Sequence, residues 1–290
     1  MKVSGFTIIR NALKYDYPVI EAIESILPLC DEVVVAVGKS DDDTLELIKS
    51  IDTDKIKIIK TIWDDSLREG GRVLAEETDK AFQEVAKQSD WAIYIQADEC
   101  IHEKYIPIIR KEMEAELNNS KLDGLLMKYT HFYGSYDYIG DSRKWYRREI
   151  RIIKNNKEIK SYKDAQGFRL NNNKLNVKLI DAYVYHYGWV KNPEFQQAKQ
   201  QSFNKMWHDD SWMDKNISKA DSFDYSEIDS LAKFTSTHPK YLQTRINKMN
   251  WTFSFDPTNK KPSLKIRFLK FIEDNTGYRI GEYKNYEIIK

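Results

Sequence analysis

The strongest constraint on the fold is an alternation of apolar runs and helix-patterned segments over about the first hundred residues. The expected strands are residues 3–9, 32–37, 56–59 and 91–95. The expected helices between them are residues 18–29, 44–51 and 71–87. Because strands joined by crossover helices pair in parallel, this order predicts an α/β fold with a mostly parallel, Rossmann-like central sheet and helices on both faces.

The pattern changes after the fourth expected strand. A helix is expected over 103–117, and further strands over 125–132, 149–154 and 178–186, with a polar stretch at 155–173. From residue 193 onward the pattern is helical and polar. We therefore expect a mixed β second half and a helical C-terminal extension. No repeat or low-complexity linker is visible, which favours one continuous body.

Two acids stand where the fourth strand should leave the sheet. Asp98 and Glu99 follow residues 91–95, a mostly apolar run that is typical of a fully buried strand. Open α/β sheets bind ligands at the carboxyl ends of their strands, and carboxylate oxygens suit a hard divalent cation, which in turn suits a phosphate-bearing substrate. Acids after a strand are also common in solvated loops, so the motif alone leaves both interpretations open.

Composition excludes several classes of protein. The 290 residues carry 46 Lys and Arg against 45 Asp and Glu, and this net charge of +1 gives no basis for general attraction to nucleic acid or anionic membranes. Cys30 and Cys100 are too few for a disulfide framework, so we expect a reducing, cytoplasmic setting. No apolar stretch approaches the ~20 residues of a membrane span, and we expect neither a transmembrane segment nor a secretion signal.

Four short stretches carry a resemblance through their shared order and spacing. They are Ile-Ile-Arg-Asn at 8–11, Asp-Glu-Val-Val-Val at 31–35, Ser-Asp-Asp-Asp-Thr at 40–44 and Ile-Gln-Ala-Asp-Glu at 95–99. With these stretches the chain resembles the family 2 nucleotide-sugar glycosyltransferases of the GT-A fold, and among them the bacterial enzymes that build surface polysaccharide. The resemblance is good over about the first 130 residues and looser afterwards.

The resemblance implies a division of the chain and part of the site. It implies a GT-A domain over 1–190, with a nucleotide-binding half at 1–100 and an acceptor-side half at 101–190, and an extension at 191–290 packed on it. The nucleotide-sugar would lie across the carboxyl ends of the first, second and fourth strands. The positions that match this site are Ile9, Arg10, Asn11, Asp41, Asp42, Gln96 and Ala97. Asp98 matches the last Asp of the family's Asp-x-Asp motif, which helps to hold Mn²⁺ or Mg²⁺ against the diphosphate.

Two departures from the family pattern bear on the ligands. Gln96 replaces the first Asp of the motif, and an amide is a poorer partner for a cation than a carboxylate. Val37 stands where many relatives have an Asp that reads the base, so the identity of the nucleotide is left open. Asp41 or Asp42 is a candidate for that role from the loop, although both also suit helix capping.

The remaining candidates lie in the second half of the chain. His186 ends a strand before a glycine and is a candidate second metal ligand, because several GT-A enzymes recruit a late His; a buried His bonded to backbone is the alternative. Asp164 is our first choice for the base that accepts the acceptor's proton, and Glu149 is the second. Arg148, and less strongly Arg72, are candidates to clamp the diphosphate, against the alternative of solvated surface charges.

These features lead to one main hypothesis and two alternatives. The main one is an inverting, metal-assisted glycosyltransferase that moves a sugar from a nucleotide-diphosphate sugar to a hydroxyl of a glycan or lipid-linked acceptor. We expect it in the cytoplasm and leave open peripheral attachment to the inner face of the cell membrane. A nucleotidyltransferase is disfavoured because residues 10–14 lack the glycine-rich phosphate loop of that class. A non-catalytic sugar-binding module on the same fold stays open because of Gln96.

Overall fold

The computed structural model describes residues 1–217, 219–258 and 263–289. Its central sheet has the strand order β3 (Ile56–Thr61), β2 (Glu32–Gly38), β1 (Val3–Ile9), β4 (Trp91–Tyr94), β8 (Arg148–Lys154), β6 (Gly124–Tyr133) and β11 (Asn173–Trp189). The strands from β3 to β4 pair in parallel. β8 is antiparallel to both β4 and β6, and β11 is parallel to β6. The expected α/β class, with a parallel first half and a mixed second half of the sheet, is confirmed.

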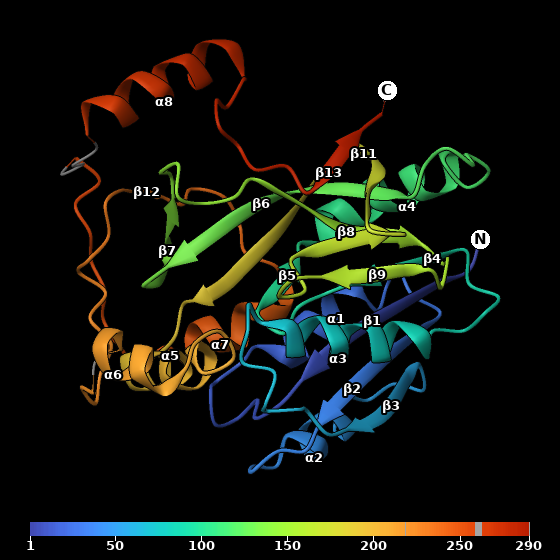
Figure 1. Cartoon of the computed structure of the whole chain (residues 1–290), viewed down its shortest axis with the longest axis horizontal. Coiled ribbons are helices and arrows are strands. Elements are labelled where there is room, and N and C mark those ends of the chain that lie inside the picture. Colours follow the sequence, from blue (N-terminus) through green and yellow to red (C-terminus); the bar gives the residue numbers. More distant parts are fainter. Residues whose placement is uncertain (218, 259–262, 290) are drawn as a thin grey trace.

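Helices cover both faces of this sheet (Figure 1). They are α1 (Val19–Ile26), α2 (Thr44–Lys49), α3 (Arg72–Gln83) and α4 (Ile106–Ala115), the last preceded by the 3₁₀ turn η1 (Glu103–Tyr105). Val33 and Val35 of β2 pack with α1, α2 and α4, whereas Val34 and Ala36 pack with α3. Successive residues of a strand point to opposite faces of the sheet, so the apolar run of β2 contributes side chains to the hydrophobic core on each face.

The second half contains strands that the sequence did not predict. The polar stretch 155–173 holds β9 (Ile159–Tyr162) and β10 (Gly167–Leu170), which continue as antiparallel hairpins into β11. Residues 135–140, where no strand was expected, form β7 (Ser135–Gly140), which pairs with β6. Asn171 and Asn172 form the β10–β11 turn at φ +49° and +64°, a left-handed conformation that Asn tolerates. Strands this short and polar give no clear alternation in the sequence.

The region after residue 190 is helical, as expected, but it also returns to the sheet. Its helices are α5 (Pro193–Asn204), α6 (Asp210–Asn216), η2 (Lys240–Leu242), α7 (Gln243–Asn247) and α8 (Leu264–Thr276). β12 (Leu231–Lys233) pairs with β7, and β13 (Tyr286–Ile288) pairs with β11. Among the described residues, no helix combines the length and the apolar character that crossing a bilayer requires.

Candidate active site

A cavity of about 470 Å³ lies where β1 and β4 end, and α5 forms its opposite wall. The residues that contribute from the two strand ends are Ile8, Ile9, Arg10, Gln96, Ala97 and Asp98. Those contributed by α5 are Lys199, Gln200, Ser202, Phe203 and Asn204. The location agrees with the rule that open α/β sheets bind ligands at the carboxyl ends of their strands.

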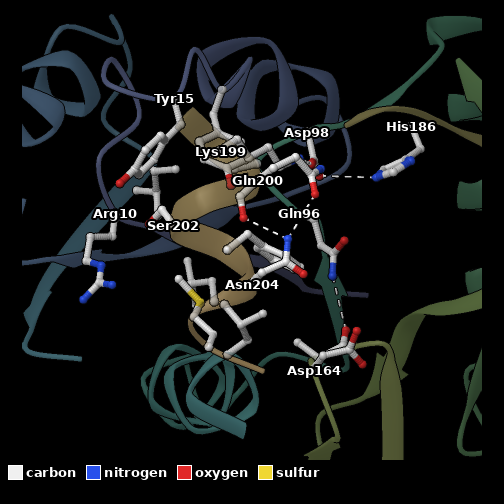
Figure 2. A pocket seen from close by; sticks show the side chains of 18 of the residues that line it. Arg10, Tyr15, Gln96, Asp98, Asp164, His186, Lys199, Gln200, Ser202 and Asn204 are labelled. Carbon is white, nitrogen blue, oxygen red and sulfur yellow. Dashed lines mark hydrogen bonds and ion pairs between the residues drawn. The ribbon is translucent and has the colours of Figure 1, made fainter. Parts of the chain in front are cut away.

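Asp98 and His186 are brought together by a short strand that sequence reasoning missed. β5 (Glu99–Ile101) pairs antiparallel with β11, which sets His186 opposite Glu99. The Tyr187 N–H donates to the Asp98 carbonyl at 2.7 Å and fixes the same register. As a result, His186 Nε2 lies 3.7 Å from Asp98 Oδ1 (Figure 2). A Cβ at Gly188 would lie 2.7 Å from His186 Nε2 and 2.8 Å from Asp98 Oδ2, so a larger residue at this position would displace these two side chains.

A second histidine fixes which nitrogen of His186 carries the proton. A carbonyl oxygen only accepts, so His131 Nε2 donates to the Tyr146 oxygen at 2.8 Å. Burial holds the pKa of His131 well below its ordinary value, and its Nδ1 therefore accepts from His186 Nδ1 at 3.1 Å. Burial also lowers the pKa of His186. At neutral pH the Nε2 of His186 is thus left with a lone pair on the side of Asp98.

This arrangement fits a divalent cation between Asp98 and His186. A carboxylate oxygen and an imidazole lone pair, 3.7 Å apart, are both electron-pair donors, and a histidine that donates its other N–H is the usual form of a metal ligand. In the described ranges no three His, Cys, Asp or Glu side chains gather as a metal site. The chain therefore offers this pair, and oxygens of a bound diphosphate and water would have to complete the coordination.

Lys199 is the cation that already contacts Asp98. Its Nζ donates to Asp98 Oδ2 at 3.0 Å and to the Gly188 carbonyl at 3.0 Å. Burial by itself raises the pKa of Asp98, but the charge of Lys199 and its hydrogen bond to the carboxylate outweigh burial and hold that pKa well below its usual range. Asp98 is therefore an ionised carboxylate with one oxygen on Lys199 and the other facing His186.

A buried ion pair braces the strand end that carries Asp98. Arg151 Nε and Nη2 donate to the two carboxylate oxygens of Glu99 at 2.9 and 2.8 Å. Tyr129 donates its hydroxyl to Glu99 at 2.6 Å, and the Gln96 N–H donates to it at 3.0 Å. Both members of the pair are almost fully buried. Because these donors occupy its oxygens, Glu99 has a structural role: it holds the strand end next to Asp98 in place.

Asp164 lines the cavity on the side away from Asp98. It also borders a second, smaller cavity of about 240 Å³ together with Gln96, Tyr146, Arg151, Lys163, Gln166 and Trp207. Figure 2 shows Gln96 between Asp98 and Asp164. The Gln96 amide donates to the Ala165 carbonyl at 3.4 Å, which ties the strand end to the Asp164 loop. Burial raises the pKa of Asp164.

Glu149 lies in the sheet and lines neither cavity. It is 3% exposed, accepts from Gln166 at 3.2 Å through one oxygen and leaves the other without a partner among the described atoms. Burial, with added repulsion from Glu99 and Asp164, raises its pKa to about 8. Glu149 is therefore a protonated, buried acid at neutral pH.

This buried acid predicts a pH-dependent stability. Between the ordinary pKa of 4.5 and about 8, the unfolded chain loses the Glu149 proton while the folded chain keeps it, so the free energy of unfolding falls as the pH rises through this window. In wild type we expect the free energy of unfolding to fall on the order of a few kcal/mol across this pH window, and Glu149→Gln should remove that fall. Urea unfolding at several pH values measures it. Exposed Glu46→Gln is the matched control. Equal slopes in Glu149→Gln and wild type would contradict the assignment.

The other predicted nucleotide-side residues divide into two groups. Ile9, Arg10, Gln96 and Ala97 line the main cavity, and the Arg10 guanidinium lies 4.6 Å from the centre of the Trp63 ring. Asn11, Asp41 and Asp42 do not line it: the Asp41 N–H donates to Asn11 at 2.8 Å, and Asp42 accepts from the N–H of Thr44 at 3.0 Å at the start of α2.

The two predicted diphosphate arginines also lie away from the cavities. Arg72 pairs with Glu76 at 3.0 Å on the surface of α3, with a 68% exposed side chain. Arg148 lies beside Tyr286 of β13. Neither borders the main or the smaller cavity. Sequence reasoning instead missed three residues, because only long-range pairing brings them to the site: Lys199 contacts Asp98, Arg151 pairs with Glu99, and His131 contacts His186.

No protein-family model matches the sequence, and no curated protein matches it. Solved structures similar to the chain include S. aureus TarS 1–349 in complex with UDP, at 17% identity and a TM-score of 0.42, covering 69% of this chain and 64% of that one. Glucosyl-3-phosphoglycerate synthase from Mycobacterium tuberculosis, in complex with Mn²⁺, UDP and phosphoglyceric acid, is similar at 18% identity and a TM-score of 0.30, covering 45% of this chain and 43% of that one.

A third similar structure is 4-diphosphocytidyl-2C-methyl-D-erythritol synthase from Anaerococcus prevotii, at 11% identity and a TM-score of 0.34, covering 53% of this chain and 70% of that one. The chain spans less than two thirds of the length of the TarS fragment.

Proposed function

We propose that this protein is a nucleotide-sugar glycosyltransferase, acting with inversion and with the help of a divalent cation. The observation that carries the proposal is the pairing of ionised Asp98 with the free Nε2 of His186 at the strand ends, inside a cavity whose other side holds Asp164. These positions support a diphosphate site at Asp98 and His186, apart from Asp164 as a carboxylate that would receive a proton. A single displacement needs both.

The chain's own residues divide the reaction between them. Asp98 and His186 would hold Mn²⁺ or Mg²⁺, which supplies stabilisation of negative charge on the departing diphosphate. Lys199 adds a fixed positive charge next to Asp98 from the opposite wall, which α5 forms. Asp164 accepts the proton of the acceptor hydroxyl while the oxygen of that hydroxyl forms a bond to the anomeric carbon of the sugar. At the same time the bond from the anomeric carbon to the diphosphate breaks, and its electron pair stays on the phosphate oxygen.

The aromatic side of the cavity suits the nucleoside. Tyr15, Tyr17 and Trp63 line it next to Ile9 and Arg10. Trp63 packs against Gly38 at the end of β2, where a Cβ would lie 2.4 Å from its Nε1. We propose that this wall receives the base, in a region where Val37 provides no carboxylate to read it.

A ligand screen tests the proposed function directly. We expect uridine and other nucleoside diphosphates, or their sugars, to raise the melting temperature more with Mn²⁺ than without it, because a ligand that binds only the folded state stabilises it. Release of the diphosphate in the presence of a glycan or lipid-linked acceptor, with inverted configuration of the product sugar, completes the test. No response to any of these ligands would contradict the proposal. Binding without turnover would favour a sugar-binding module, and pyrophosphate release from a nucleoside triphosphate would favour a nucleotidyltransferase.

Lys199 provides a separate prediction. Replacing it with Met should lower kcat/KM on the order of 10²-fold, because one preorganised positive charge near the leaving diphosphate is lost. Steady-state kinetics on the donor measure this effect. Lys205→Met, which removes an exposed lysine just after α5, is the matched control. Unchanged turnover in Lys199→Met would show that the Lys199 ammonium only neutralises the charge of Asp98 and does not stabilise the leaving diphosphate.

A further inference from the structure

α8 presents a row of large apolar side chains to solvent. Leu264, Phe268 and Phe271 are 82%, 63% and 65% exposed, although each would be expected in a core. Their i, i+4, i+7 spacing places them on one side of the helix, and we call them the α8 apolar row. Figure 1 shows α8 at the periphery of the molecule, apart from α5, α6 and α7.

The opposite side of α8 is anchored to the body, so the row cannot turn inward. Glu273 has a side chain only 12% exposed and pairs with Arg147 at 3.1 Å and with Arg279 at 3.2 Å. Arg143 pairs with the same carboxylate. Three arginines around one buried acid fix the rotation of the helix about its own axis.

Basic side chains flank the apolar row. Lys265 and Arg267 are exposed on either side of it, and Lys270 pairs with Asp274 one turn further along. An amphipathic helix with aromatic and aliphatic residues on one side and basic residues beside them is the pattern of an element that lies in a membrane interface. The whole chain carries only +1, so any attraction to an anionic surface must be local to such a patch.

We propose that α8 docks on an anionic membrane surface, with the apolar row inserted among the lipids and Lys265 and Arg267 at their headgroups. A second copy of the chain fits less well, because a symmetric contact through this row would set the same basic residues against each other. Lys265 and Arg267 are exposed and form no ion pair with any residue that the structure describes, which leaves their charge available to anionic lipid.

The segment that follows α8 connects this surface to the smaller cavity. Tyr283 is 57% exposed, and the Lys163 ammonium lies 5.0 Å from the centre of its ring. Lys163 and Asp164 both line the smaller cavity. If the proposed function holds, membrane docking would bring this cavity to a lipid-linked acceptor; the docking itself rests only on α8.

Vesicle flotation without any nucleotide tests the docking. We expect the wild-type protein to float with phosphatidylcholine vesicles that contain phosphatidylglycerol and to stay in solution with phosphatidylcholine alone. The double variants Phe268→Ser/Phe271→Ser and Lys265→Glu/Arg267→Glu should each lower the partition coefficient at least about tenfold. Ile62→Ser, at a side chain 75% exposed elsewhere, and Lys87→Glu/Lys111→Glu are matched controls and should bind as wild type does.

Three results would overturn the docking proposal: no wild-type flotation at low salt, equal flotation of the α8 variants and wild type, or a dimer in solution that the Phe268→Ser/Phe271→Ser variant abolishes while flotation persists. Transfer to a soluble acceptor should be unchanged in both α8 variants, because none of the four positions lines a cavity. A failure of membrane docking is therefore separable from a failure of the glycosyltransferase proposal.

Discussion

Asp98→Asn should abolish metal-dependent donor binding and lower kcat/KM on the order of 10³-fold or more, the largest effect that we expect from a single substitution. The amide keeps the shape of the side chain but loses its negative charge. In the wild type that charge pairs with Lys199 at 3.0 Å, and it would also face the bound cation. Steady-state kinetics and titration of Mn²⁺ in the presence of a nucleoside diphosphate measure both losses. Turnover close to that of wild type would exclude Asp98 from the site.

The same variant needs a control for folding. Removing the Asp98 charge leaves the Lys199 ammonium buried and unpaired, which costs on the order of 3–5 kcal/mol in comparable pairs. The double variant Asp98→Asn/Lys199→Met removes both charges and should regain much of that stability. We expect it to regain no activity, which separates the chemical role of Asp98 from its structural one.

Asp164→Asn should leave donor binding intact while kcat falls on the order of 10²- to 10⁴-fold, because only the proton acceptor is lost. The pKa of Asp164 is raised by burial, so the wild-type rate should decline as the pH falls through that raised value, above the range of an exposed Asp. Donor affinity by calorimetry and kcat across pH are the two measurements.

Glu149→Gln distinguishes the two candidate bases. Glu149 lines neither cavity, so its amide variant should retain turnover when Asp164 is the base. If Glu149→Gln loses kcat while Asp164→Asn keeps it, the assignment must be exchanged. Equal loss of donor binding and turnover in Asp164→Asn would indicate that the Asp164 loop only shapes the cavity through contacts such as Gln96 to Ala165.

Local sequence patterns were enough to predict the strands and helices that are long and apolar. β1, β2 and the helix between them, α1, fall within a few residues of their predicted bounds, and the run from Val33 to Val37 is buried on both faces of the sheet. β9, β10 and β7 were not predicted, because short polar strands are stabilised by their partners rather than by their own composition. The positions of Arg72 and Arg148 likewise depend on ion pairs and contacts that no spacing in the sequence reveals.

The sequence by itself determined the α/β class and the strand end that carries Asp98, because these follow from periodicity and from motif order, whereas the choice of His186 and Asp164 as candidates follows from what the family resemblance implies. Only the tertiary structure decided what surrounds Asp98. The β5–β11 pairing places His186 beside it, His131 frees the Nε2 of His186, and α5 brings Lys199 to the second oxygen. These contacts join segments up to 101 residues apart, and such contacts arise from the packing of the whole chain.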